Sequence, residues 1–116
     1  MVMKTNGRTE ERIMSNLTTN VRYEGNVYSG EIQNISKQGM YIEAIGITIK
    51  KSPEILILLA AEKSLYKLKG EIRWSKTLRC RSDEKSLYGM GIKITEAQSE
   101  YLNYVEYLKH LNRFNN

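Results

Sequence analysis

The sequence has little of what builds several common kinds of site. Its 116 residues include one cysteine, one histidine and one proline. The single cysteine, Cys80, has no internal partner for a disulfide. Together with His110 it also falls short of a cluster with the spacing of metal ligands. We therefore expect neither a disulfide framework nor a metal or other cofactor.

Long apolar runs are missing as well. No stretch approaches the roughly 18 apolar residues that span a bilayer, and the polar residues 1–6 lack the apolar core of a signal peptide. We therefore expect a cytoplasmic protein without membrane insertion. The length and the hydrophobic content of 41% predict one domain with a single core.

Groups for acid–base or nucleophilic catalysis are sparse. His110 is far along the chain from any paired carboxylates, Cys80 is isolated, and no glycine-rich loop of the phosphate-cradling kind is present. These absences favour a binding protein over an enzyme. The net charge of +5 favours acidic partners, although the basic residues alternate with acidic ones as on a solvated surface.

Most of the chain has the pattern of short β-strands. Two β-favouring runs, 17–23 and 27–35, flank a glycine-containing connection and predict a hairpin. A third strand is expected after Gly39. Residues 55–59 form a continuous apolar run, which is typical of a strand buried on both sides.

Two further strands show alternation. Residues 66–74 alternate between apolar and polar side chains, and residues 88–94 repeat the period, so each strand has one core face. The polar residues 75–86 between them predict a long exposed loop. Trp74 ends the apolar face of the first strand, which favours core packing over base stacking for its ring.

A helix is expected at the end of the sequence. Residues 95–98 have the pattern of a capping box, and an apolar stripe of helical period follows. The stripe consists of Ala97, Tyr101, Tyr104, Val105, Leu108 and Leu111. Six strands and one amphipathic helix predict a mainly β fold, a small antiparallel barrel or sandwich with the helix against it. Residues 1–16 are expected to be a flexible arm, and residues 17–116 the folded domain.

Two short motifs lie on either side of the first expected hairpin. Arg8 and Arg12 are in the polar arm, and their guanidinium groups are bidentate donors for phosphate oxygens and for the O6/N7 edge of guanine. Asn34, Ser36 and Gly39 form an Asn-x-Ser-x-x-Gly turn that supplies complementary hydrogen-bonding groups. Together the motifs predict a site for an anionic guanine nucleotide.

Each motif also has a purely structural interpretation. Arg8 and Arg12 can be solvated charges in a disordered arm. Asn34, Ser36 and Gly39 can simply shape a turn, because Asn and Ser bond to nearby backbone and glycine accepts a positive φ. The two motifs together favour the ligand site for the arginines. For Gly39 both interpretations can hold at once.

The motif pair resembles the PilZ domain family, whose members are bacterial receptors for cyclic di-GMP. The resemblance covers nearly the whole chain, including residues 70–74 and 89–92. It implies a six-stranded antiparallel β-barrel with a C-terminal α-helix. The departure to note is Asn34, at a position where the family more often has aspartate. A neutral amide makes a weaker contact than a carboxylate.

The resemblance also implies a role for each motif residue. Arg8 and Arg12 would close over the ligand and contact its phosphates and guanine edges. Asn34 and Ser36 would bind a guanine from the barrel surface, and Gly39 would permit a positive φ or a close backbone approach. Trp74 is a secondary candidate.

The implied activity is signalling without catalysis. Binding of cyclic di-GMP would order the arm and relay the signal to a bacterial effector protein, in processes such as motility or biofilm formation. Two alternatives stay open. A small barrel with basic and aromatic residues can bind single-stranded nucleic acid, with an affinity that falls steeply with salt. A PilZ-type adaptor can dock on pilus or flagellar machinery without nucleotide.

Overall fold

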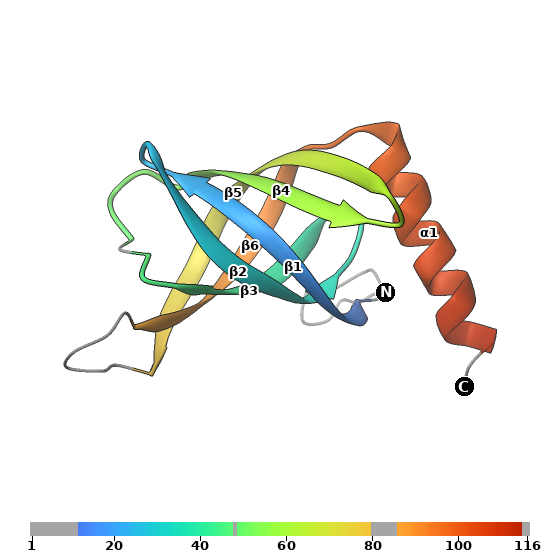
Figure 1. Cartoon of the computed structure of the whole chain (residues 1–116), viewed down its shortest axis with the longest axis horizontal. Coiled ribbons are helices and arrows are strands. Elements are labelled where there is room, and N and C mark those ends of the chain that lie inside the picture. The colour runs from blue at the N-terminus through green and yellow to red at the C-terminus, as the bar shows by residue number, and fades with distance from the viewer. Residues whose placement is uncertain (1–11, 48, 80–85, 115–116) are drawn as a thin grey trace, which may run out of the picture.

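A computed structural model describes residues 12–47, 49–79 and 86–114 of the chain. Within these residues it shows a closed barrel of six antiparallel strands with one helix beside it (Figure 1). The elements are β1 (Ile13–Tyr23), β2 (Asn26–Ile35), β3 (Gly39–Ile45), β4 (Glu54–Ala61), β5 (Ser64–Arg79), β6 (Leu87–Glu96) and α1 (Ser99–Phe114). Around the barrel the order is β1-β2-β3-β6-β5-β4, and β4 pairs with β1 to close it. The predicted fold class is confirmed.

The first hairpin forms as predicted, with a longer first strand. Glu24 and Gly25 have φ values of 52° and 82°, the pair of positive values that a two-residue hairpin turn requires. β1 begins at Ile13, whose buried side chain pairs with Ile35. Residues 13–16 therefore belong to β1 and not to the expected arm. The first eleven residues lie outside the described part of the chain.

One hydrophobic core fills the barrel. It takes inward-pointing side chains from every strand, including the fully buried Val21, Ile32, Ile42, Ile57, Leu68 and Met90. The helix α1 lies at one end of the barrel (Figure 1). There Tyr101 and Tyr104 approach the ring of Tyr66, with ring centroids 6.1 and 5.4 Å away. Burying this apolar stripe of α1 is what holds the helix on the barrel.

Three sequence-based expectations differ from the structure. β4 is fully buried on one side only. Ile55, Ile57 and Leu59 face the core, whereas Leu56 and Leu58 point to the outside and are half-buried. β5 runs on to Arg79, through residues 75–79 that were expected in a loop. The expected capping box is wrong, since β6 continues through Glu96 and α1 begins at Ser99.

A bulge in β5 reverses which side chains face outward. Before the bulge, Tyr66 and Leu68 point into the core. The register against β6 then shifts between Ile72 and Trp74, so that Trp74 pairs with Gly91 and its side chain lies on the outer face. Trp74 is 48% exposed, so the prediction that its ring packs in the core is wrong.

Candidate ligand-binding site

The two motifs meet where the start of β1 pairs with the end of β2. Met14 pairs with Asn34, which brings the residue just before β1 to the edge of the Asn-x-Ser-x-x-Gly turn. There Arg12 Nη1 donates a hydrogen bond to Asn34 Oδ1 at 3.0 Å, across 22 residues of sequence. One residue from each predicted motif is therefore in direct contact. Arg8 lies outside the described residues.

Gly39 makes room for this contact. A Cβ atom on Gly39 would lie 2.9 Å from Arg12 Nη2 and 2.8 Å from the carbonyl oxygen of Ile92, closer than real Cβ contacts allow. Among the described residues, the glycines with positive φ are Gly25 and Gly46. Gly39 is therefore required for a close approach and not for a left-handed backbone conformation.

Ser36 shapes the turn from inside. Its side chain is fully buried, and its Oγ accepts hydrogen bonds from the backbone N–H groups of Gly39 at 3.0 Å and Gln38 at 3.3 Å. The Ser36 backbone N–H in turn donates to the Gly39 carbonyl at 2.9 Å. These bonds match the structural interpretation of the motif. A direct contact from Ser36 to a ligand stays a prediction.

The same turn is attached to α1. The Tyr101 hydroxyl donates a buried hydrogen bond to the Ser36 carbonyl oxygen at 2.9 Å. Lys37 forms an ion pair with Glu106, 2.5 Å between Nζ and Oε2, on the solvated side of the contact. Because exposed ion pairs contribute little, the Tyr101 bond is the stronger link. The sequence places Tyr101 in the apolar stripe, and no pattern in it signals this hydrogen bond.

From Asn34 a row of paired residues crosses the outside of the barrel. Asn34 pairs with Tyr41 on β3, Tyr41 pairs with Gly91 on β6, and Gly91 pairs with Trp74 on β5. Neighbouring strands are about 4.8 Å apart, so the row extends about 14 Å along the curved surface. We call Asn34, Tyr41 and Trp74 the aromatic face.

Two glycines of β6 let the aromatic rings lie flat on the barrel. A Cβ atom on Gly91 would overlap the indole of Trp74, and one on Gly89 would overlap the ring and hydroxyl of Tyr41. The two rings are stacked, with centroids 5.6 Å apart and planes 22° apart. Sequence reasoning considered Trp74 and missed Tyr41. The available signal was the Gly-x-Gly of β6, which leaves space for large side chains on neighbouring strands.

Charged groups border the aromatic face. Lys76 Nζ lies 5.8 Å from the centroid of the Trp74 ring. Tyr41 donates a hydrogen bond to Glu43 Oε2 at 3.1 Å. Partial burial raises the pKa of Tyr41 above its ordinary value of 10.0, and Glu43 raises it further. The phenol therefore keeps its proton at neutral pH and remains a donor to Glu43.

The chemistry of this surface suits a planar anion. The flat rings of Tyr41 and Trp74 offer a stacking surface, while Arg12 and Lys76 supply positive charge at its two ends. In the described part of the chain, no three His, Cys, Asp or Glu side chains gather as metal ligands. No helix among those residues has the length and apolar character needed to span a bilayer.

The described residues thus combine a closed six-stranded barrel, one helix beside it, and an arginine held at an Asn-x-Ser-x-x-Gly turn. The PilZ domain profile matches residues 6–109, and the chain belongs to the PilZ domain family. PilZ domains are ligand-binding or adaptor domains, and cyclic di-GMP signalling is the role of the family.

A solved structure shares this fold. The Bacillus subtilis inhibitor of motility (MotI/DgrA) superposes with a TM-score of 0.63 at 14% sequence identity. The aligned region covers 96% of this chain and 52% of that chain, so this chain spans about half of the length of the relative. At this identity the likeness concerns the fold. No curated protein matches the sequence.

Proposed function

We propose that this protein is a receptor for cyclic di-GMP. The observation that carries the proposal is the hydrogen bond from Arg12 to Asn34, packed over Gly39, because it unites the two motifs at one edge of the barrel. The role of the PilZ family supports the same ligand. A receptor for this messenger acts in the bacterial cytoplasm.

Guanine recognition would begin with an exchange of hydrogen bonds. The N1–H and amino groups of guanine are donors and suit the Asn34 Oδ1 atom, which accepts from Arg12 in the structure. Binding would displace Arg12 from the amide and free its guanidinium for the O6/N7 edge or a phosphate. Arg12 thus holds the Asn34 side chain ready for the base. Arg8 is proposed to add a second phosphate contact.

The aromatic face would hold a base by stacking. Trp74 is 48% exposed, and the Tyr41 ring extends the same flat surface toward Asn34. Stacking of one base on an aromatic side chain is worth about 1–3 kcal/mol. Lys76 beside Trp74 would add charge attraction to a phosphate. These contacts offset the weaker acceptor that Asn34 provides in place of a carboxylate.

The signal would pass from the turn to α1. A ligand that shifts residues 36–39 also shifts the Ser36 carbonyl that Tyr101 contacts and the Lys37 ammonium that Glu106 contacts. We propose that the altered seating of α1, with ordering of the residues before β1, is what an effector protein reads. The ligand binds without being consumed, so binding is the whole biochemical act.

Titration calorimetry tests the receptor function, with GTP and cyclic di-AMP as ligand controls. We expect the wild type to bind cyclic di-GMP selectively and Arg12→Ala and Asn34→Ala each to lose about tenfold or more in affinity. Arg22→Ala is the matched control, because Arg22 is an exposed β1 arginine away from the turn. Undiminished affinity in both motif variants, or equal binding of the three nucleotides, contradicts the proposal.

A further inference from the structure

The outer side of β4 carries apolar side chains that the barrel covers only in part. Leu56 and Leu58 point away from the core and are half-buried, and the next outward residue, Ala60, is exposed. Ala60 pairs with Leu65 of β5, which is 65% exposed. Outward positions of a strand with one buried face are usually polar. The apolar character of this side is therefore unexplained by the fold.

Cationic residues border Leu56 on both sides and Leu58 on one side. Leu56 is paired with Arg22 of β1 and with Lys69 of β5, so this leucine lies between two cationic residues whose strands are about 10 Å apart. Leu58 is paired with Lys67 of β5 and with the neutral Asn20 of β1. Lys69 Nζ also lies 3.7 Å from Glu96 in an exposed contact, which holds the lysine only weakly. We call Arg22, Leu56, Leu58, Lys67 and Lys69 the β4 surface.

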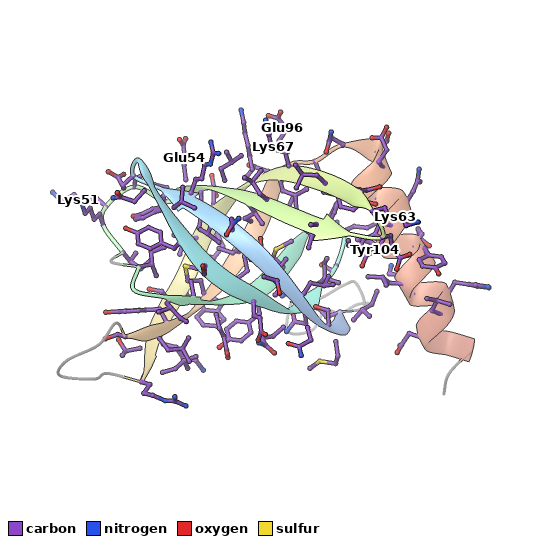
Figure 2. The ribbon with its side chains drawn as sticks, viewed as in Figure 1. Lys51, Glu54, Lys63, Lys67, Glu96 and Tyr104 are labelled. Atoms are coloured by element: carbon purple, nitrogen blue, oxygen red, sulfur yellow. The ribbon has the colours of Figure 1, made fainter. Side chains whose placement is uncertain are left out.

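A groove at one end of the β4 surface brings acidic and basic side chains together around Leu56. An open cavity of about 520 Å³ is lined by Leu56 with its two flanking cations, and by Glu54 and Glu71, which are paired across β4 and β5. Figure 2 shows Glu54, Lys67 and Glu96 projecting from the same side of the barrel. Along β4 the surface thus passes from carboxylates to leucines with cationic neighbours.

We infer that the β4 surface docks an acidic amphipathic helix of a protein partner. Leu56 and Leu58 are about 6.8 Å apart along the strand, close to the roughly 6 Å between apolar residues one turn apart on a helix. Glutamates on the flanks of such a helix reach Arg22 on one side and the two lysines on the other. The net charge of +5 adds long-range attraction.

Other occupants fit this surface less well. The β4 surface has no aromatic ring on which bases could stack, so a single-stranded nucleic acid would gain only phosphate contacts there. An anionic membrane would meet the repelling carboxylates of Glu54 and Glu71 at the edge of the same groove. A helix avoids this repulsion, because its glutamates can lie opposite Arg22, Lys67 and Lys69 and away from the two carboxylates. The inference does not rest on the cyclic di-GMP site, because the turn of that site follows β2.

The test uses the full isotopically labelled chain and a defined probe. The probe is a synthetic helical peptide with leucines one turn apart and glutamates on both flanks, and its control has lysines in place of the glutamates. We expect the acidic peptide alone to shift the amide NMR signals of residues 22, 56–58 and 67–69. Residues 34–39 should stay unchanged.

Charge reversal provides the matched variants. Arg22→Glu with Lys67→Glu should weaken binding of the acidic peptide about tenfold or more, whereas Lys76→Glu, which borders the aromatic face, should weaken it less than about twofold through the lower net charge alone. Well-dispersed spectra of each variant establish that it is folded. The inference is overturned by unchanged spectra, by equal shifts with the basic peptide, or by shifts centred on other residues. It is also overturned if anionic vesicles or single-stranded RNA cause the same shifts at lower concentration.

Discussion

Two outer regions of one barrel differ in chemistry. The aromatic face has Tyr41 and Trp74 lying flat over glycines, next to the Asn34 turn. The β4 surface has leucines beside cations. Both regions have the same kind of aliphatic core behind them. The inward side chains therefore determine the barrel, and the outward side chains determine what each side can bind.

β5 contributes to both regions because of its bulge. Lys67 and Lys69 are outward before the bulge, and Trp74 is outward after it. Without that shift the two lysines and the indole would point to opposite sides of the sheet. The two proposed activities therefore depend on different residues of one strand and can be removed separately by mutation.

The largest effect is expected from filling the space at the motif contact. Gly39→Val places side-chain atoms against Arg12 and the Ile92 carbonyl, which should abolish cyclic di-GMP binding and lower the free energy of unfolding by about 1–3 kcal/mol. Gly25→Asn is the control, because a Cβ there meets nothing within 4 Å and asparagine tolerates the positive φ. Calorimetry and urea unfolding measure the two effects. A variant that binds normally contradicts the geometry described here.

Removal of the indole should affect the aromatic face alone. Trp74→Ala is expected to weaken cyclic di-GMP binding by about 1–3 kcal/mol, with little loss of stability because the ring is half-exposed. The acidic helical peptide should bind this variant as it binds the wild type. Loss of both activities in a folded variant would show that the two regions are coupled.

Tyr101→Phe separates binding from relay. The change leaves the Ser36 carbonyl buried without this donor, which should lower the free energy of unfolding by about 1–2 kcal/mol. Nucleotide affinity should change little, while the shifts of α1 amide signals on ligand addition should shrink. If α1 responds as in the wild type, the Tyr101 bond is not the route of the signal.

A carboxylate at the turn should strengthen the guanine contact. Asn34→Asp supplies a charged acceptor for two guanine donors at the cost of a stronger bond to the Arg12 that the base displaces, so affinity for cyclic di-GMP should rise by a net of about 1 kcal/mol. Asn34→Gln, which keeps the amide but moves it, should bind more weakly than the wild type. Calorimetry under matched salt compares the three proteins. Weaker binding by the aspartate variant argues against guanine donors at this position.

The smallest effect concerns the ionisation of Tyr41. The pKa of Tyr41 is raised, so the folded state keeps the phenol proton to a higher pH than the unfolded state does. Because the unfolded state loses its proton first, the free energy of unfolding falls as the pH rises above 10.0. Glu43→Gln removes the carboxylate and should lower the Tyr41 pKa toward its ordinary value. Tyr104, whose pKa is raised mainly by burial and by Glu62, serves as the internal reference. Ultraviolet titration follows tyrosinate formation in both proteins.

Local patterns predicted the barrel because its strands alternate and its turns carry the required residues. The hairpin at Gly25 and the strand 88–94 follow from neighbours in sequence, and the hairpin in turn brings the two motifs together. The exposure of Trp74 does not, because it depends on a bulge that no alternation reveals. The Tyr41–Trp74 stack and the Tyr101–Ser36 bond depend on contacts between distant segments.

The apolar run in β4 shows a different limit. Leu56 and Leu58 indicate burial on both sides, and the described chain buries only one. Periodicity registers that a side chain is apolar, and it does not distinguish burial by the same chain from burial by a partner. The prediction of two buried sides was wrong for β4, and the partly exposed leucines that contradict it are the basis for the proposed docking surface.

The amide NMR spectrum of the labelled chain during addition of cyclic di-GMP tests the central claim most directly. The account predicts shifts at Arg12, at residues 34–39 and at Tyr41 and Trp74, with residues 22 and 56–58 unchanged. A spectrum that stays unaltered at saturating nucleotide, or one that changes only at the β4 surface, contradicts it.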